Sequence, residues 1–314
     1  MNMTEVVEVY LARQRSLGMR FESAERMLHR FCRTLGNPEI SKVEPELVAT
    51  FLRGQGSLSA SWLLRYRVLT GLYKFAIGRG YVDCSPLPTA LPKLPPQQTP
   101  YVYSTEELRR SLDATEVLRV GHSPQVPAMY RTLILLLYGT GMRIGEALRL
   151  TLQDVDLTEQ VITIRDTKFF KTRLVPIGPR LNRELIGYTD RRRLRPLRCG
   201  EMSPFFTTRD GRAWHYVRVI SWFQDVRRAA GIVCPAGEPR PPRLHDLRHT
   251  AAVHRAVAWY RTGQDVQLLL PQLATYLGHV DIRSTQRYLQ MAPDLLQAAN
   301  QRFAKYAMGG DHEG

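Results

Sequence analysis

The sequence predicts a mainly α-helical protein with a small antiparallel β-sheet, an α+β fold divided into two domains. Three observations support this prediction. Apolar residues recur at helical spacing along most of the chain, two short strand-like segments lie near its middle, and a proline-rich stretch follows the first helical region. With 314 residues, the chain is long enough for each of two domains to bury its own core.

The first domain, residues 1–92, is expected to be a small helical bundle. The pattern is clearest where Phe21, Leu28 and Phe31 fall on one helical face, and the tripeptide Gly36-Asn37-Pro38 ends that helix. The predicted helices cover residues 4–17, 21–35, 45–52 and 59–77. The last of them carries tryptophan, leucine and tyrosine on one side and basic residues on the other.

A linker separates the two domains. Residues 86–100 contain six prolines in fifteen positions, too many for a helix or a central strand. We therefore place the linker at 93–102 and the second domain at 103–314.

The second domain is expected to begin with a capping box, Ser104 with Glu107, which opens a helix. Strands are predicted where β-branched and apolar residues cluster, on either side of a tip that contains Lys168 and Lys171. The predicted strands are 161–165 and 172–177, with 203–208 as a candidate third. The predicted helices are 104–112, 126–138, 215–230, one that begins near His245, and 294–307.

The charge balance indicates a polyanionic partner. Lysines and arginines exceed acidic residues by 44 to 29, a formal net charge of +15. Nucleic acid and an acidic membrane surface both fit such an excess. The start of the chain has no signal-peptide core, and no apolar run approaches the length of a membrane span, so nucleic acid is favoured over a membrane. We expect a cytoplasmic, nucleoid-associated protein.

Three groups of basic residues are the predicted DNA-phosphate contacts. One lies on the polar side of the 59–77 helix, one in the linker and one in the dense run 191–198. The simpler alternative is that each group only solvates the surface. The predicted contacts are Arg65, Arg67, Lys74, Lys93, Arg191, Arg192 and Arg193.

The four cysteines, Cys32, Cys84, Cys199 and Cys234, are too far apart to form a CxxC motif. They are expected to be reduced, and neither a zinc site nor a cofactor is predicted.

The residues that could carry chemistry are concentrated in three separate segments. GTGMRIGEALRL places Arg143 after a glycine turn, HDLRHTAAVH contains His245 and Arg248, and YLGHVDIRSTQRYL contains His279 and Tyr288. Together with His249, the set comprises two arginines, three histidines and one tyrosine. This inventory suits transfer of a phosphodiester to a tyrosine hydroxyl without a metal ion.

Each residue type has a physical reason to take part. A guanidinium is always charged and binds two phosphate oxygens at once, so Arg143 and Arg248 would stabilise the charge that develops on an attacked phosphate. A tyrosine hydroxyl, with an ordinary pKa of about 10, loses its proton more easily beside two such groups. Tyr288 could then attack the phosphate and form a covalent intermediate.

Other interpretations fit single residues but not the set. His245 and His249 have the spacing of a zinc-binding HExxH motif, yet no glutamate follows His245 and Arg248 would repel the metal. Tyr288 alone would more often be a core residue. The joint occurrence of the separated motifs decides for the phosphodiester chemistry.

The order R…HxxRH…LGH…Y strongly resembles the tyrosine recombinase (phage integrase) family. The resemblance implies an N-terminal core-binding domain and a C-terminal integrase-type catalytic domain that close around DNA as a clamp. It also implies that His245 and His279 contact the phosphate and that His249 supports the site. Glu146, one helical turn after Arg143, is expected either to orient Arg143 or to cap a helix, without a chemical role.

The family also implies a lysine that protonates the leaving 5′-oxygen, at the first position of a KGxKxR turn. The segment KFFKTR matches this register at Lys168, but Phe169 replaces the glycine of the turn. Lys171 therefore remains an alternative.

What the resemblance implies about function is site-specific DNA recombination through a 3′-phosphotyrosine, serving integration, excision or transposition of a mobile element. The expected partner is duplex DNA with short inverted-repeat core sites, bound by a homotetramer or a mixed tetramer in a bacterial cell. The terminal helix could dock in cis or in a neighbouring subunit. The alternatives are a type IB topoisomerase-like enzyme and a non-catalytic DNA-binding regulator.

Overall fold

The computed structural model describes residues 1–19, 21–55, 58–95, 100–119, 124–165, 172–238, 240–278, 297 and 300. The chain divides into two compact units, Met1–Gln98 and Thr99–Gly314. The division falls inside the 93–102 stretch that its proline content marks as a linker. Of the helices in the described ranges, none combines the length and apolar character that a membrane span requires.

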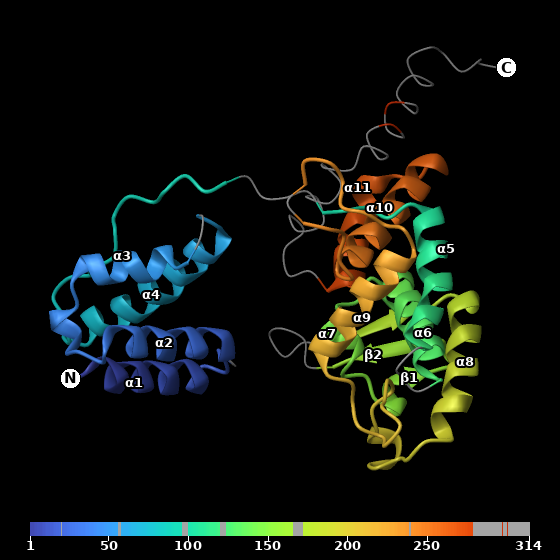
Figure 1. Ribbon diagram of the computed structural model, residues 1–314, viewed down its shortest axis with the longest axis horizontal. Helices are drawn as coiled ribbons and strands as arrows, with labels where there is room; N and C mark the ends of the chain where they lie inside the picture. Colours follow the sequence, from blue (N-terminus) through green and yellow to red (C-terminus); the bar gives the residue numbers. More distant parts are fainter. Residues whose placement is uncertain are drawn as a thin grey trace. The chain divides into compact units, whose positions relative to one another are not determined.

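The regular elements in the described part of the first unit are all helices (Figure 1), and its predicted helices are found within one or two residues of their expected ends. Asn2 and Glu5 form a capping box that starts the first helix, and Gly36 ends the second with a left-handed backbone, φ 74°. The elements are α1 (Met3–Ser16), α2 (Glu22–Leu35), η1 (Ile40–Lys42), α3 (Pro45–Arg53) and α4 (Ala60–Gly78).

The second unit contains helices and one small sheet, as the sequence predicts. Its first helix begins with the expected capping box: the Ser104 N–H donates to Oε2 of Glu107, and the Glu107 N–H donates to Oγ of Ser104. The helices are α5 (Thr105–Asp113), η2 (Ala114–Arg119), α6 (Val126–Thr140), α7 (Ile144–Ala147), η3 (Leu152–Asp154), α8 (Pro179–Arg193), η4 (Gly200–Met202), α9 (Tyr216–Ala229), α10 (Asp246–Arg261) and α11 (Val266–Leu277).

The sheet is antiparallel, in the order β1 (Val155–Asp156), β2 (Val161–Ile164) and β3 (Arg173–Pro176). Ile162 pairs with both Val155 and Val175, and all three side chains face the core. The prediction of a third strand at 203–208 is wrong. That segment makes only isolated bridges through Pro204 and Thr207, partly because a proline has no N–H to donate to a ladder.

Helix α6 lies at the centre of the second unit. It is apolar on almost every side, and in Figure 1 it runs between α10 (orange) and α8 (yellow), packing against both. The sequence pattern does not predict α8, because three of the residues on its buried face are polar: Asn182, Thr189 and Arg192.

The segment that enters the second unit is fixed to the start of α10. The buried Tyr103 donates its N–H to Oγ1 of Thr250 at 3.0 Å, and its hydroxyl donates to the Arg243 carbonyl at 3.0 Å. The predicted helix at 294–307 lies outside the described residues except for Gln297 and Asn300, both of which are helical.

Candidate active site

Arg143 stands at a sharp turn between α6 and α7. Gly141 ends α6 with a left-handed backbone, φ 62°, which glycine adopts without steric cost. A Cβ atom here would lie 2.4 Å from Cδ2 of Leu277, so the turn packs directly against the end of α11. Arg143 then caps α7, and its N–H donates to Oε2 of Glu146 at 2.9 Å. The turn therefore sets the direction in which the Arg143 side chain leaves the backbone.

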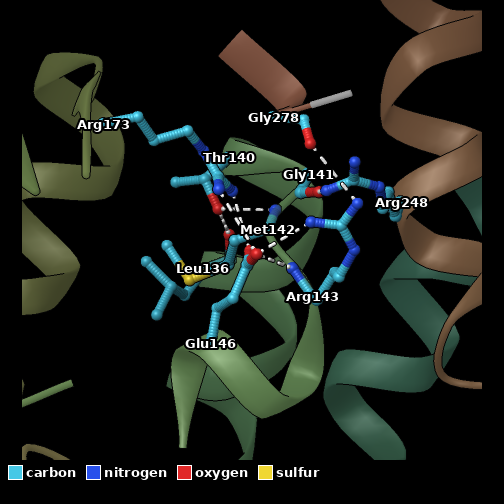
Figure 2. Close-up of polar contacts among 9 residues, drawn as sticks. All are labelled: Leu136, Thr140, Gly141, Met142, Arg143, Glu146, Arg173, Arg248 and Gly278. Carbon is cyan, nitrogen blue, oxygen red and sulfur yellow. Dashed lines mark hydrogen bonds and ion pairs between the residues drawn. The ribbon is translucent and has the colours of Figure 1, made fainter. Parts of the chain in front are cut away.

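Glu146 is a buried carboxylate that holds two arginines (Figure 2). Its Oε1 accepts from Nη1 of Arg143 at 2.8 Å, and its Oε2 accepts from Nη2 of Arg173 at 2.7 Å. Burial acts to raise the pKa of this carboxyl, but the hydrogen bonds from Arg173 and the Arg143 backbone outweigh burial and hold the pKa at about 2. Because Arg173 lies in β3, Glu146 links the β2–β3 hairpin to the turn that carries Arg143.

Arg248 reaches the same turn from the first turn of α10. Its side chain is buried, with 2% of the residue exposed, and its Nη1 donates to the Gly141 carbonyl at 2.7 Å. Arg143 is held in a similar way at the end of α11, where its Nη2 donates to the Gly278 carbonyl at 3.4 Å. Two carbonyls, each from a glycine that ends a helix, thus hold two guanidinium groups that are 105 positions apart in sequence (248 − 143).

The histidines lie beside these arginines. His245 immediately precedes α10, and its ring stands perpendicular to that of the buried His249, with 5.1 Å between centroids. The pKa of His245 is lowered first by burial and then by the charge of Arg248, with Arg143 acting in the same direction. A neutral imidazole can donate from one nitrogen and accept at the other, so His245 is suited to either side of a proton transfer.

His249 is buried close to the carboxylate of Asp246. Its Nε2 lies 4.0 Å from Oδ1 of the buried Asp246, which also accepts from Nη2 of Arg243 at 3.0 Å. Arg243 donates its backbone N–H to the other oxygen of this carboxylate, so Asp246 organises the start of α10. Within the described ranges, no group of three or more His, Cys, Asp or Glu residues is arranged to hold a metal ion.

The described residues therefore form a cationic site with a neutral imidazole beside it. Such an arrangement can bind the non-bridging oxygens of a phosphodiester and stabilise the extra negative charge of its transition state. The profile of the phage integrase family matches residues 106–294, which contain every residue of this site. The chain belongs to the phage integrase family.

Known relatives agree with this assignment. The protein y4rB of Sinorhizobium fredii, an integrase/recombinase by name, is 34% identical over 307 residues, which cover 96% of each chain. The solved structure of the Tn1549 transposon integrase with transposon right end DNA has a TM-score of 0.68 at 18% identity, covering 95% of this chain and 99% of that one. A lambda integrase tetramer bound to a Holliday junction has a TM-score of 0.67 at 16% identity, covering 92% and 77%.

Members of the phage integrase family are tyrosine-type site-specific recombinases, enzymes that cleave and rejoin DNA. The two solved structures share the mainly helical fold with a small sheet. The predicted fold class and the predicted family are both confirmed.

The structure brings three of the six predicted catalytic residues together: Arg143, His245 and Arg248. The remaining predictions, Lys168 with its alternative Lys171, His279 and Tyr288, lie outside the described residues. Their roles stay predictions. Gly278 is described, and it immediately precedes His279.

Sequence reasoning missed Arg173. A signal for it exists, because Arg173 occupies the final position of the KGxKxR register that begins at Lys168. In the structure its side chain is 11% exposed and packs so closely on Gly278 that a Cβ there would lie 2.5 Å from its Nη1. Arg173 therefore contacts both the carboxylate that holds Arg143 and the backbone that leads to His279.

The predicted DNA contacts differ in exposure. Arg67, Lys74, Lys93 and Arg191 are exposed, whereas Arg65 is half-buried and donates from Nη1 to the Leu52 carbonyl at 2.8 Å. This hydrogen bond from Arg65 to Leu52 supports the end of α3.

The run 191–198 is not the uniform solvated surface that its sequence suggests. Arg193 is exposed and pairs with Glu201, but Arg192 points inward and is only 1% exposed. Arg192 follows the buried face of α8, one turn after Tyr188. The structure therefore places Arg192 inside the fold and not on the exposed surface that the sequence predicted for it.

Proposed function

We propose that this protein exchanges DNA strands at specific sites through a covalent 3′-phosphotyrosine formed by Tyr288. The observation that carries the proposal is that Arg248 donates to the Gly141 turn from which Arg143 leaves, while Arg143 is held at the Gly278 carbonyl and His245 lies beside both arginines. Two anchored guanidinium groups are what the attack on a phosphodiester requires, because the reacting phosphate gains negative charge.

In the proposed reaction, the Tyr288 oxygen attacks the scissile phosphorus and the bond to the 5′-oxygen breaks. His245 accepts the tyrosine proton, and Lys168 or Lys171 supplies a proton to the leaving 5′-oxygen. Arg143, Arg248 and His279 hold the phosphate oxygens. The phosphotyrosine conserves the bond energy, so a 5′-hydroxyl of a second DNA end can reverse the step and release the enzyme without a nucleotide cofactor.

Glu146 and His249 are proposed to position this machinery rather than to react. Glu146 uses Nη1 of Arg143 and leaves Nε and part of Nη2 for a phosphate, and the arginine side chain retains 38% exposure. A lone carboxylate facing the substrate would repel it. Glu146 is 4% exposed and already bound to two arginines, so its charge is compensated before DNA arrives.

The first unit is proposed to be a DNA-binding core-binding domain, with Arg67, Lys74 and Lys93 as phosphate contacts on its exposed surface. We further propose that the natural substrate is a mobile element with short inverted-repeat core sites. The name of y4rB and the transposon DNA in the Tn1549 complex support this role. The lambda integrase tetramer on a Holliday junction supports action as a tetramer, formed by this chain alone or with related recombinases.

A trapping experiment tests the proposal. Duplex DNA from the flanks of the gene, nicked near candidate sites so that the cut strand diffuses away, is incubated with wild type and with Tyr288→Phe. We expect an adduct that survives detergent with wild type only, and equal DNA binding by both proteins in a gel shift. Sequencing the trapped ends would give the core site.

Other outcomes separate the alternatives. An adduct that persists in Tyr288→Phe contradicts the choice of nucleophile. Relaxation of supercoiled plasmids without sequence preference would indicate a topoisomerase-like enzyme. Tight binding without any adduct, even with related recombinases added, would indicate a DNA-binding regulator.

A further inference from the structure

A second group of arginines lies at and just after the last turn of α8, and one of them is buried. Arg192, on the last turn of α8, is only 1% exposed. Its Nε donates to the Pro204 carbonyl at 2.9 Å, but Nη1 and Nη2 are buried and have no hydrogen-bond partner among the residues that the structure describes. Arginine is almost never fully buried unless it is paired, because an uncompensated charge loses its hydration without replacement. Arg192 therefore lacks the partner that its burial requires.

Arg195 lies next to it and is half-buried. Its Nη1 donates to the Thr207 carbonyl at 2.7 Å, and its Nη2 contacts Oε1 of Gln125. The charges of Arg195 and Arg192 oppose each other, and burial lowers the pKa of both. Among the described residues, no aspartate or glutamate pairs with either guanidinium. Two repelling cations thus share a partly desolvated site with no counter-charge.

Neighbouring carbonyls hold this cluster in place. Pro204 and Thr207 fix the two guanidinium groups, and the Phe205 carbonyl accepts from the Tyr188 hydroxyl at 3.1 Å. Neutral carbonyls orient the two arginines but do not neutralise them, so the two guanidinium charges remain without a counter-charge among the described residues.

A cavity of about 160 Å³ adjoins the cluster. Arg191, Arg192 and Arg195 line it together with Tyr188, Gln125 and Met129. Gln125 is the N-cap residue of α6, so the cavity also lies at the positive end of a fifteen-residue helix. The lining therefore combines three arginines with a favourable helix terminus, and the volume is several times the roughly 30 Å³ of one water molecule.

We propose that this cavity binds an oxyanion of the phosphate class, held by Arg192 and Arg195 at the N-terminus of α6. A tetrahedral anion offers several acceptor oxygens, which suits two planar guanidinium groups better than a chloride ion does. The Gln125 side chain, which contacts Nη2 of Arg195, would change rotamer so that the anion can bind there. The anion would supply the missing counter-charge and thereby stabilise the packing of α6 on α8.

The proposed site is separate from the phosphodiester site. The two helices are antiparallel, because Leu181 at the start of α8 adjoins Gly139 near the end of α6, whereas Arg192 lines the cavity with Met129. Arg143 follows the opposite end of α6, about 20 Å away at 1.5 Å per residue. One helix thus connects two cationic sites.

Thermal unfolding of the full chain tests the proposal, in inorganic phosphate and in chloride at matched pH and ionic strength. We expect phosphate to raise the Tm of wild type by about 3–6 °C at ten times its dissociation constant, with saturation. Arg192→Met should lose most of this shift. Arg228→Met is the matched control, since it removes the same charge from an exposed arginine paired with Asp225 and should keep the shift.

Phosphate could also bind between the catalytic arginines, so the titration is repeated in Arg143→Ala. A shift that survives in Arg143→Ala and disappears in Arg192→Met supports the cavity. The reverse result, a shift lost in Arg143→Ala and kept in Arg192→Met, overturns the proposal.

A second variant covers the case in which Arg192→Met fails to fold. Gln125→Glu places a carboxylate beside Arg195 and should substitute for the ligand, so its phosphate-dependent shift should fall to less than half that of wild type. A full shift in Gln125→Glu contradicts the proposed position of the anion.

The oxyanion could be free phosphate or a backbone phosphate of DNA, and DNA binding distinguishes these sources. If DNA supplies it, free phosphate leaves the Tm unchanged, while Arg192→Met lowers the slope of log K against log salt by about 1. If neither the Tm nor that slope responds to Arg192→Met, the proposal is wrong.

Discussion

At the scale of single residues, the site depends on how buried charges are compensated. Arg248 and Arg173 are nearly inaccessible, and each is held by acceptors that belong to another segment. Glu146 is the most constrained of these acceptors, because it compensates Arg143 and Arg173 together. Removing one member of such a group leaves uncompensated charge in a desolvated place, which costs more than an exposed ion pair is worth.

Glu146→Gln should therefore destabilise the protein in a pH-dependent way. The carboxyl pKa is about 2 in the folded state, below its ordinary value of 4.5, so its contribution is complete above pH 4.5 and is lost as the pH falls towards 2. We expect wild type to lose about 3 kcal/mol through this group between pH 5 and 2, and the variant to lack that component. Urea unfolding at several pH values measures it.

The exposed pair of Glu116 with Arg119 provides the control for this prediction. Glu116→Gln should change stability by less than about 1 kcal/mol at any pH, since solvent screens the pair. Parallel pH profiles for wild type and Glu146→Gln would show that the buried carboxylate is not the anchor described above.

At the scale of elements, helix ends rather than helix faces build the site. Helices α6 and α11 both end at left-handed glycines, Gly141 and Gly278, and the carbonyls of these glycines accept from Arg248 and Arg143. The β3 residue Arg173 then packs on Gly278. Three elements distant in sequence meet at one point, so the geometry depends on how closely their backbones approach.

Gly278→Ala tests this dependence, and Gly263→Ala is its matched control. Both glycines have a left-handed backbone, with φ of 71° and 74°, so each substitution carries a strain of about 1 kcal/mol. Only at Gly278 would the new Cβ meet Arg173, 2.5 Å from Nη1, while nothing lies within 4 Å at Gly263. We expect Gly278→Ala to cost about 2–4 kcal/mol and to impair cleavage strongly.

The control variant should unfold with a loss near 1 kcal/mol and retain cleavage of the nicked duplex. Equal stability and equal cleavage in the two variants would mean that Arg173 moves aside freely, and the close approach at Gly278 would then be unimportant.

At the scale of the whole molecule, the net charge of +15 predicts binding that depends steeply on salt. The charge is not uniformly available, however. Some arginines stabilise the fold, as Arg65 of α4 does by holding the end of α3, and others face solvent, as Arg67 of α4 does. Neighbouring positions on α4 can therefore be compared directly.

Arg67→Ala should weaken binding to any duplex and reduce the slope of log K against log salt by about 1, without changing stability. Arg65→Ala should instead destabilise the first unit by about 1 kcal/mol, because the Leu52 carbonyl loses its donor. Fluorescence anisotropy with a labelled duplex between 50 and 200 mM salt, about the range in which such effects are large, measures the slopes. An unchanged slope in Arg67→Ala would remove that residue from the DNA surface.

The sequence by itself determined the features that depend on local chemistry. Helix periodicity, the capping box at Ser104 and the glycine stops at Gly36 and Gly141 act within a few residues, so the helices and the fold class could be predicted. The motifs around Arg143 and His245 indicated the family for the same reason, since the residue types that mark it stand close together in each motif.

Only the tertiary structure decided which of the basic residues are buried and what compensates them. The pairing of Glu146 with Arg173 spans 27 positions, and no local pattern records it. Because hydrophobic periodicity detects only apolar faces, the sequence predicted neither α8, whose buried face is largely polar, nor the burial of Arg192 on that face. Burial depends on which elements pack together, and packing is a property of the folded chain rather than of any one segment.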